Sequence, residues 1–257
     1  MPVIDLNCDL GESFGAYKMG MDEEILRYIT SANIACGFHA GDPMVMAQTV
    51  AWCRACGVRV GAHPGFPDLV GFGRRNMSLS PEEVKAIVIY QIGALKAFCD
   101  GAGVRLYHVK PHGALYNMAA RDYKFARAIC QGIKAVDEGL HLLALSSSEM
   151  LRAAKELGIP YASEVFADRA YQSDGTLAPR SQKGAVIEDE DQGVSRVIRM
   201  VQEGRVAAID GSDISLQADS VCVHGDGIKA LSFVKKIRKN LEAAGIEIRG
   251  FGGGLES

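Results

Sequence analysis

Apolar residues along this chain follow two different spacings. Short, nearly continuous apolar segments are typical of buried parallel strands, and longer segments with an apolar residue every three or four positions are typical of amphipathic helices. The short segments predict strands near residues 3–8, 31–36, 58–62, 104–110, 141–145, 161–165 and 219–223. The longer segments predict helices near residues 43–57, 80–101, 122–138, 147–157, 189–203 and 226–244. Strands that alternate with helices in this way predict a parallel sheet.

The clearest helix start follows Ser80. This serine is placed to cap the helix, Pro81 suits the first turn, and Glu83 completes a capping box. Gly101 and Gly103 are expected to end the same helix, because glycine readily adopts the left-handed conformation that follows a last turn.

The number and order of these elements predict the fold class. Seven strands in a chain of 257 residues, without a linker or a break in composition, predict a single α/β domain over residues 1–257, folded as one closed parallel βα-repeat barrel of about seven strands. An open, doubly wound sheet is the alternative. Two long segments, 64–78 and 166–185, follow predicted strands, at the end where such a barrel carries its chemistry.

Polar residues gather where the predicted strands end. Because all strands of a parallel barrel point the same way, we expect these residues to meet at one opening. Four of the six histidines are among them, which packing alone does not explain. In chain order the group contains Asn7, Asp9, Glu12, His39, His63, Lys110, His112, Glu164, Asp168, Arg169, His224 and Asp226.

Each of these residues also has a structural interpretation. Asp9 would cap a turn, Lys110 would pair with a carboxylate, and His63 or His224 would be buried with its hydrogen bonds satisfied. Asp226 would cap a helix. The gathering of so many polar residues at the strand ends, rather than any single one of them, predicts a functional site. Three residues are interpreted as structural: His108, His141 and Trp52.

Composition excludes several classes of protein. Net charge is -3, and the 28 basic residues form no concentrated patch, so a nucleic-acid partner is not expected. No apolar run approaches the ~20 residues of a membrane span, and no signal peptide precedes the first strand. Seven scattered cysteines suit reduced thiols, and Cys53 and Cys56 fall inside a helix, which favours core packing over redox chemistry. These features together predict a cytoplasmic protein.

Several long motifs resemble one family, the LamB/YcsF family, whose members are the A subunits of 5-oxoprolinase. The resemblance covers almost the whole chain. It rests on DLNCDLGESFG (5–15), ANIACGFHAGD (32–42), GAHPGFPD (61–68), GFGRR (71–75), VKPHGALYN (109–117), FADRAY (166–171) and CVHGD (222–226).

The resemblance implies a fold and an activity. The implied fold is a barrel similar to the glycoside hydrolase/deacetylase superfamily. The implied activity is the ATP-dependent opening of 5-oxo-L-proline to L-glutamate, performed with two further subunits, B and C. Because the chain has no G-x-x-x-x-G-K-[ST] loop, ATP is expected to bind partly or wholly on those partner subunits.

Opening a lactam needs an activated carbonyl, an activated water and a protonated leaving nitrogen. We assign Asp9 as the general base with Glu12 as second choice, Lys110 to stabilise negative charge, and His63 and His112 to carry protons. Arg74 and Arg169 are candidates to bind the substrate carboxylate, since arginine suits carboxylates. The substrate-binding candidates are Asn7, His39, Arg74, Asp168, Arg169 and His224.

Two other functions stay open at this stage. One is a stand-alone metal-dependent deacetylase or amidohydrolase, in which Asp9, His39 and His63 bind a divalent cation. Metal analysis of the protein would distinguish it. The other is a non-catalytic subunit that captures 5-oxoproline and delivers it to its partners. Binding without turnover would favour that function.

Overall fold

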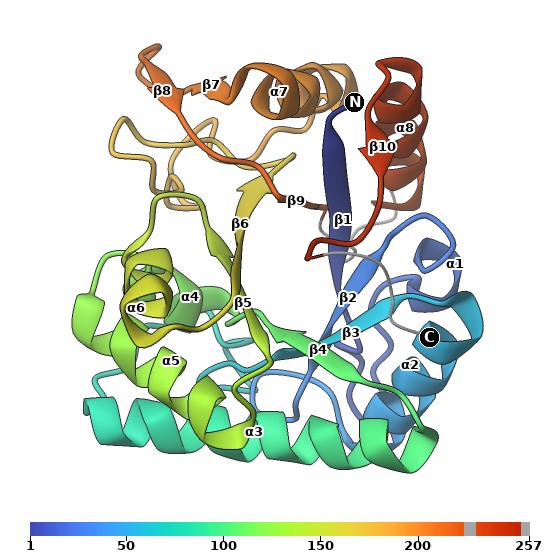
Figure 1. Ribbon diagram of the computed structural model, residues 1–257, viewed down its shortest axis with the longest axis vertical. Helices are drawn as coiled ribbons and strands as arrows, with labels where there is room; N and C mark the ends of the chain where they lie inside the picture. The colour runs from blue at the N-terminus through green and yellow to red at the C-terminus, as the bar shows by residue number, and fades with distance from the viewer. Residues whose placement is uncertain (224–229, 253–257) are drawn as a thin grey trace.

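Seven parallel strands form a closed barrel in the computed structural model, which describes residues 1–223 and 230–252. Each strand pairs with the next, and the last of them pairs with both the sixth and the first, which closes the ring (Figure 1). The strands are β1 (Val3–Leu10), β2 (Ser31–Ala35), β3 (Arg59–His63), β4 (Leu106–Val109), β5 (His141–Leu145), β6 (Tyr161–Phe166) and β9 (Ser220–Cys222). The predicted closed barrel is confirmed, and the alternative of an open sheet is wrong.

Six helices surround the barrel close to the predicted positions. They are α2 (Pro43–Cys56), α3 (Pro81–Ala102), α5 (Tyr123–Val136), α6 (Glu149–Leu157), α7 (Glu190–Glu203) and α8 (Ala230–Ala243). The predicted capping box is present, since Ser80 Oγ accepts from the Glu83 amide and the Glu83 carboxylate accepts from the Ser80 amide. Gly103 ends α3 in a left-handed conformation, whereas Gly101 lies inside the helix. None of the described helices is long and apolar enough to cross a membrane.

Several short elements were not predicted. They are α1 (Asp22–Ile25), α4 (Gly113–Ala119), an antiparallel ribbon of β7 (Arg205–Ala207) and β8 (Asp213–Ser215), and β10 (Glu247–Ile248), which pairs with the start of β1. Elements of two to seven residues are too short to show a periodic apolar pattern, so no signal for them is visible in the sequence. Near the C-terminus, α8 and β10 lie beside β1 in Figure 1.

The first strand shows how the sequence divides its side chains between the two faces of the barrel wall. Successive side chains of a strand point to opposite faces. The odd positions Asp5, Asn7 and Asp9 join polar networks that link β1 to other strands of the ring, whereas Ile4 and Leu6 are fully buried in the hydrophobic core. The interior of this barrel is therefore polar along β1, and Asp9 lies at its C-terminal end.

Aromatic side chains fill the other end of the barrel, where the strands begin. Phe251 lies against Tyr107, which stacks on His141 with ring centroids 4.7 Å apart. The carbonyl of Phe251 accepts from the Tyr107 hydroxyl at 3.0 Å and from the guanidinium of Arg59. The contacts of His141 thus agree with its structural interpretation. Trp52, also interpreted as structural, is partly buried against the core.

Candidate active site

A cavity of about 510 Å³ opens at the C-terminal ends of the strands. Its lining combines acidic groups with a larger number of basic ones. The charged and imidazole side chains that line it are Asp9, Glu12, His63, Arg74, Lys110, His112, Arg121, Arg169 and Arg180. The predicted convergence of strand-end residues on one opening is therefore present in the structure.

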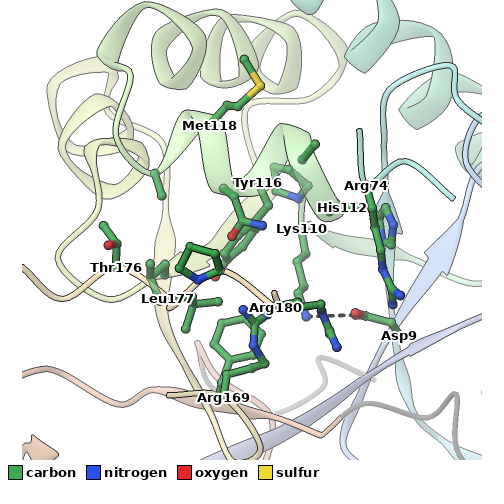
Figure 2. Close-up of a pocket in the computed structure, with 18 of the residues that line it drawn as sticks. Asp9, Arg74, Lys110, His112, Tyr116, Met118, Arg169, Thr176, Leu177 and Arg180 are labelled. Carbon is green, nitrogen blue, oxygen red and sulfur yellow. Dashed lines mark hydrogen bonds and ion pairs between the residues drawn. The ribbon is translucent and has the colours of Figure 1, made fainter. Parts of the chain in front are cut away.

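Lys110 is the centre of the buried charges in this site. Its ammonium group lies 2.9 Å from Asp9 Oδ1 and 2.8 Å from Glu164 Oε1, although only 3% of its side chain is exposed. It also donates to Cys222 Sγ at 3.1 Å and lies 3.3 Å from Asn7 Oδ1. Figure 2 shows the link between Lys110 and Asp9 at the cavity.

Burial by itself would lower the pKa of Lys110. The neighbouring acidic groups, of which Asp9 is the strongest, outweigh burial and raise that pKa well above its usual value. The ammonium is therefore charged at every physiological pH. A fixed positive charge next to Asp9 favours the ionised form of this carboxylate, which is the form that a general base needs.

A second layer of polar side chains fixes Asp9 from below. Asn33 donates to Asp9 Oδ1 at 2.9 Å and to Asn7 Oδ1 at 2.8 Å. The ring of His108 donates to Asn33 Oδ1 at 2.7 Å, and Asn7 donates to Ser220 Oγ at 2.8 Å. Asn7 therefore lies one layer beneath the cavity with its amide group engaged, and His108 supports the site from inside the barrel.

Three histidines and Glu12 form a second cluster beside Asp9. His63 Nε2 lies 3.4 Å from Asp9 Oδ2 and 3.0 Å from His112 Nδ1. Glu12 Oε1 lies 3.5 Å from His39 Nε2 and 3.7 Å from His112 Nδ1. The rings of His39 and His112 are stacked, with centroids 3.7 Å apart.

These histidines are buried, with at most 5% of each residue exposed. Burial, followed by the neighbouring His63, lowers the pKa of His39 well below its usual value. Burial, followed by His39 and His63, does the same to the pKa of His112. Neutral imidazoles have a lone pair on one ring nitrogen. The ligand atoms of Glu12 and the three histidines lie within 4.8 Å of one another, so this cluster could hold a metal ion.

Two glycines allow the loops to approach these rings closely. A Cβ atom on Gly73 would lie 2.7 Å from His39 Cβ and 2.8 Å from His112 Cδ2, and one on Gly113 would lie 2.6 Å from the Gly73 carbonyl oxygen. Both residues also have positive φ angles, which glycine adopts without strain. The amide of Ala114 donates to the Gly73 carbonyl at 2.8 Å, and this bond joins the loop after β3 to the first turn of α4.

Guanidinium groups also line the cavity. Arg169 is 5% exposed and donates to the Ala178 carbonyl at 2.6 Å. Burial, followed by the nearby charge of Arg180, lowers the pKa of Arg169 to about 10. Arg74 lies 4.9 Å from the centre of the Phe72 ring. Figure 2 shows Arg74, Arg169 and Arg180 around Asp9 and Lys110, an arrangement that suits an anionic ligand.

The structure brings most of the candidate residues together. Of those predicted from the sequence, Asp9, Glu12, His63, Lys110, His112, Arg74 and Arg169 line the cavity. His39 lies behind its wall in the histidine cluster, and Asp168 is not among the residues lining the cavity in the described part of the chain. His224 and Asp226 lie outside the described residues.

Two further members of the site had no assigned role in the sequence analysis. Tyr116 donates to Glu164 Oε2 at 2.7 Å, and burial raises the pKa of Tyr116 well above its usual value. The hydroxyl therefore stays protonated and holds Glu164 against Lys110. Arg180 lies in the long loop after β6. Glu164 was already among the strand-end residues named from the sequence, but the direction in which Tyr116 points depends on helix α4, which was not predicted.

A parallel barrel with paired buried charges and histidines at the C-terminal ends of its strands has the architecture of a barrel enzyme. Solved structures with little sequence identity to this chain share that architecture. A GH113 β-1,4-mannanase aligns with a TM-score of 0.50 at 11% identity, over 93% of this chain and 99% of its own, which reflects the fold alone. The likeness agrees with the expected similarity to glycoside hydrolases.

Closer matches identify the family. The LamB/YcsF family matches residues 4–255 of this chain. A Clostridium beijerinckii protein, named as the A subunit of 5-oxoprolinase, is 62% identical over 245 residues, which cover 95% of this chain and 96% of that protein. The crystal structure of the lactam utilization protein from Thermus thermophilus aligns with a TM-score of 0.91 at 50% identity, over 97% of this chain and all of the other. The chain belongs to the LamB/YcsF family.

Proposed function

We propose that this chain is the subunit of an ATP-dependent 5-oxoprolinase that opens the lactam ring of 5-oxo-L-proline to give L-glutamate. It would act in the cytoplasm with two partners, subunits B and C. The names of its relatives support this function. The observation that carries it is the geometry of Asp9, whose carboxylate is held by Lys110 at the edge of a cavity rich in guanidinium groups.

The reaction itself sets the requirements on the site. A five-membered lactam is a stabilised amide, and phosphorylation of its oxygen by ATP would activate the ring carbon toward attack by water. The C–N bond would then break with protonation of the nitrogen, and a second water would hydrolyse the resulting acyl phosphate to L-glutamate and phosphate. Since the sequence contains no phosphate-binding loop of the common kind, we place ATP partly or wholly on the partner subunits. This chain would then receive the lactam or its phosphorylated form.

Asp9 is our candidate for the base that deprotonates the attacking water. Its Oδ1 atom accepts from Lys110 and Asn33, and its Oδ2 atom lies 3.4 Å from His63 Nε2. Only 10% of the side chain is exposed, so the carboxylate is positioned by the protein and shielded from bulk water. Glu12, on the other side of the histidines, is the second candidate.

The other charged residues have roles that follow from their places. Lys110 would keep Asp9 ionised, and its charge would also stabilise negative charge that develops next to Asp9. Arg74, Arg169 and Arg180 are placed to bind the carboxylate or phosphoryl group of the substrate. His63 Nε2 lies 3.4 Å from Asp9 Oδ2, which makes His63 a candidate for proton transfer to the leaving nitrogen, with His112 next to it.

The test measures glutamate release from 5-oxoproline and ATP by this chain together with subunits B and C. We expect the variant Asp9→Asn to lower kcat by at least about 100-fold, which is the usual contribution of a general base. Asp100→Asn, which changes an exposed carboxylate on α3, is the matched control and should leave kcat unchanged. Full activity of Asp9→Asn would remove the assignment of the base, and no activity in a mixture of folded subunits would refute the function.

One observation favours a second candidate function. The cluster of Glu12, His39, His63 and His112 has the ligand types of a metal site, as a stand-alone metal-dependent amidohydrolase or deacetylase requires. Amide or ester hydrolysis by this chain alone, without ATP, would favour that function. Binding of 5-oxoproline without any effect of Asp9→Asn on turnover by the complex would favour a non-catalytic binding subunit.

A further inference from the structure

The hydrogen bonds around His63 and His112 fix where each ring carries its proton. His63 Nδ1 lies 2.7 Å from the carbonyl oxygen of Lys110, and His112 Nε2 lies 2.8 Å from the carbonyl oxygen of Phe72. A carbonyl oxygen only accepts hydrogen bonds, so these two nitrogens are the donors. In the neutral rings, His63 Nε2 and His112 Nδ1 therefore both carry lone pairs.

Those two lone-pair nitrogens face each other at 3.0 Å. Two acceptors at this distance repel each other unless a positive charge lies between or beside them. Glu12 Oε1, 3.7 Å from His112 Nδ1, adds a third electron-rich atom to the same small space. His39 is fully buried beside it, and among the described residues neither of its ring nitrogens has a hydrogen-bond partner. The arrangement is unfavourable as a set of neutral groups and favourable around a cation.

The distances suit a metal ion. Ligand atoms bound at 2.0–2.2 Å around a tetrahedral zinc ion are about 3.3–3.6 Å apart. In this cluster, the separations of 3.0 Å between His63 and His112 and 3.7 Å between His112 and Glu12 lie just below and just above that range. Metal-bound histidines also usually donate their second ring N–H to a backbone carbonyl or carboxylate, as His63 and His112 do here.

We infer that Glu12, His63 and His112 bind one divalent transition-metal ion of the zinc type. His39 is outside this ligand set, because its ring is stacked parallel on that of His112 and the two rings cannot direct in-plane lone pairs at one ion. The fourth position is then open to water or substrate, as in catalytic zinc sites. Imidazole ligands favour zinc, copper, iron or nickel over magnesium and calcium. Such an ion lowers the pKa of a bound water to about 7 and polarises carbonyl or phosphoryl oxygens. Asp9, which pairs with Lys110, stays outside this ligand set and remains available as the base. The two histidines would then hold the ion and would not carry protons.

The first test measures metal binding by the whole chain, independently of turnover. The protein is stripped with a chelator, dialysed, and titrated with zinc alone, and the bound metal is counted by elemental analysis. We expect one zinc per chain and at least about 100-fold weaker binding in His112→Gln, since even outer-shell changes cost 10–100-fold. The control is His141→Gln, which alters a histidine at the far end of the barrel and should bind zinc as the unchanged chain does.

Circular dichroism shows whether each variant is folded, and Glu12→Gln replaces His112→Gln if the latter does not fold. Substoichiometric zinc in the unchanged chain, or equal affinity in folded His112→Gln or Glu12→Gln, would overturn the inference and leave a shared proton between His63 and His112. The inferred metal site and the proposed lactam-opening function can be refuted independently of each other. Glutamate release by the three subunits without zinc binding would support the proposed function and refute the metal site. Zinc binding without glutamate release would support the metal site and refute the proposed function.

Discussion

The buried ammonium of Lys110 permits a sharp test of the electrostatic argument. Replacing Lys110 with methionine preserves much of the side-chain volume but removes the charge that pairs with Asp9 and Glu164. Breaking a buried ion pair from one side typically costs about 3–5 kcal/mol, because the remaining charge is left uncompensated. Here two carboxylates lose their partner, and no more than 10% of either side chain is exposed. We therefore expect a loss of about 4 kcal/mol in the free energy of unfolding.

The exposed pair Lys96–Asp100 provides the matched control. Its ammonium lies 2.9 Å from a carboxylate oxygen, the same distance as in Lys110–Asp9, but 36% of the lysine side chain and 60% of the aspartate side chain are exposed. Exposed pairs of this kind contribute about 0.3–0.5 kcal/mol on a helix. The variant Lys96→Met should therefore unfold almost as the unchanged chain does. The difference between the losses of unfolding free energy in Lys110→Met and Lys96→Met isolates the effect of burial, because the two ion pairs have the same length.

The assay is urea unfolding followed by circular dichroism at pH 7. At about 2–4 °C per kcal/mol for a chain of this size, Lys110→Met should also melt roughly 10 °C lower. The double variant Lys110→Met/Glu164→Gln should recover part of the loss, with a coupling free energy of about 1–3 kcal/mol, because it removes one stranded carboxylate. Tyr116 can still donate to the new amide oxygen. An unchanged urea midpoint for Lys110→Met, or strictly additive losses in the double variant, would refute the reasoning.

Two further predictions concern stability. Burial, followed by the nearby charges of His141 and Lys110, lowers the pKa of His108 to about 3, so below pH 6.5 the unfolded chain binds a proton that the folded chain does not. The free energy of unfolding should therefore fall as the pH drops from 6.5 toward 3. In His108→Gln, the change of this free energy with pH should be smaller by about 1.4 kcal/mol per pH unit, measured by urea unfolding between pH 6 and 4.5. Equal slopes in the two proteins would contradict a buried neutral imidazole. Ser80→Ala should cost about 1 kcal/mol in the free energy of unfolding, because the Glu83 amide loses its cap, and an unchanged melting temperature would contradict this.

Much of the fold followed from local patterns in the sequence. Continuous apolar runs indicated seven strands, and helix signals such as Ser80 and Gly103 placed boundaries to within a few residues. Position at a strand end was enough to bring Asp9, Lys110 and His112 to one cavity, since a parallel barrel places all its carboxyl ends on one side. These inferences need only the order of elements.

The pairing inside the site was not predictable in the same way. Lys110, which follows β4, pairs with Glu164 in β6. This pairing depends on the width of the barrel and on the directions of the two side chains. Likewise, Asn33 sits inside a buried strand, where the sequence alone does not reveal that its amide supports Asp9. Arg180 lies in a long loop with no periodicity at all. Contacts between distant segments are set by packing, and packing leaves little trace in a local pattern.

The aromatic packing of Phe251, Tyr107 and His141 at the beginning of the strands has a consequence for turnover. Within the described residues, these aromatic side chains fill the end of the barrel where the strands begin, whereas the cavity lies at the other end and has Arg74, Arg169 and Arg180 among its lining residues. Under the proposed function, substrate and product would therefore enter and leave on the same side of the barrel. The arginines that would bind the incoming substrate would also contact the departing product, so under this proposal tighter binding of the substrate would slow release of L-glutamate.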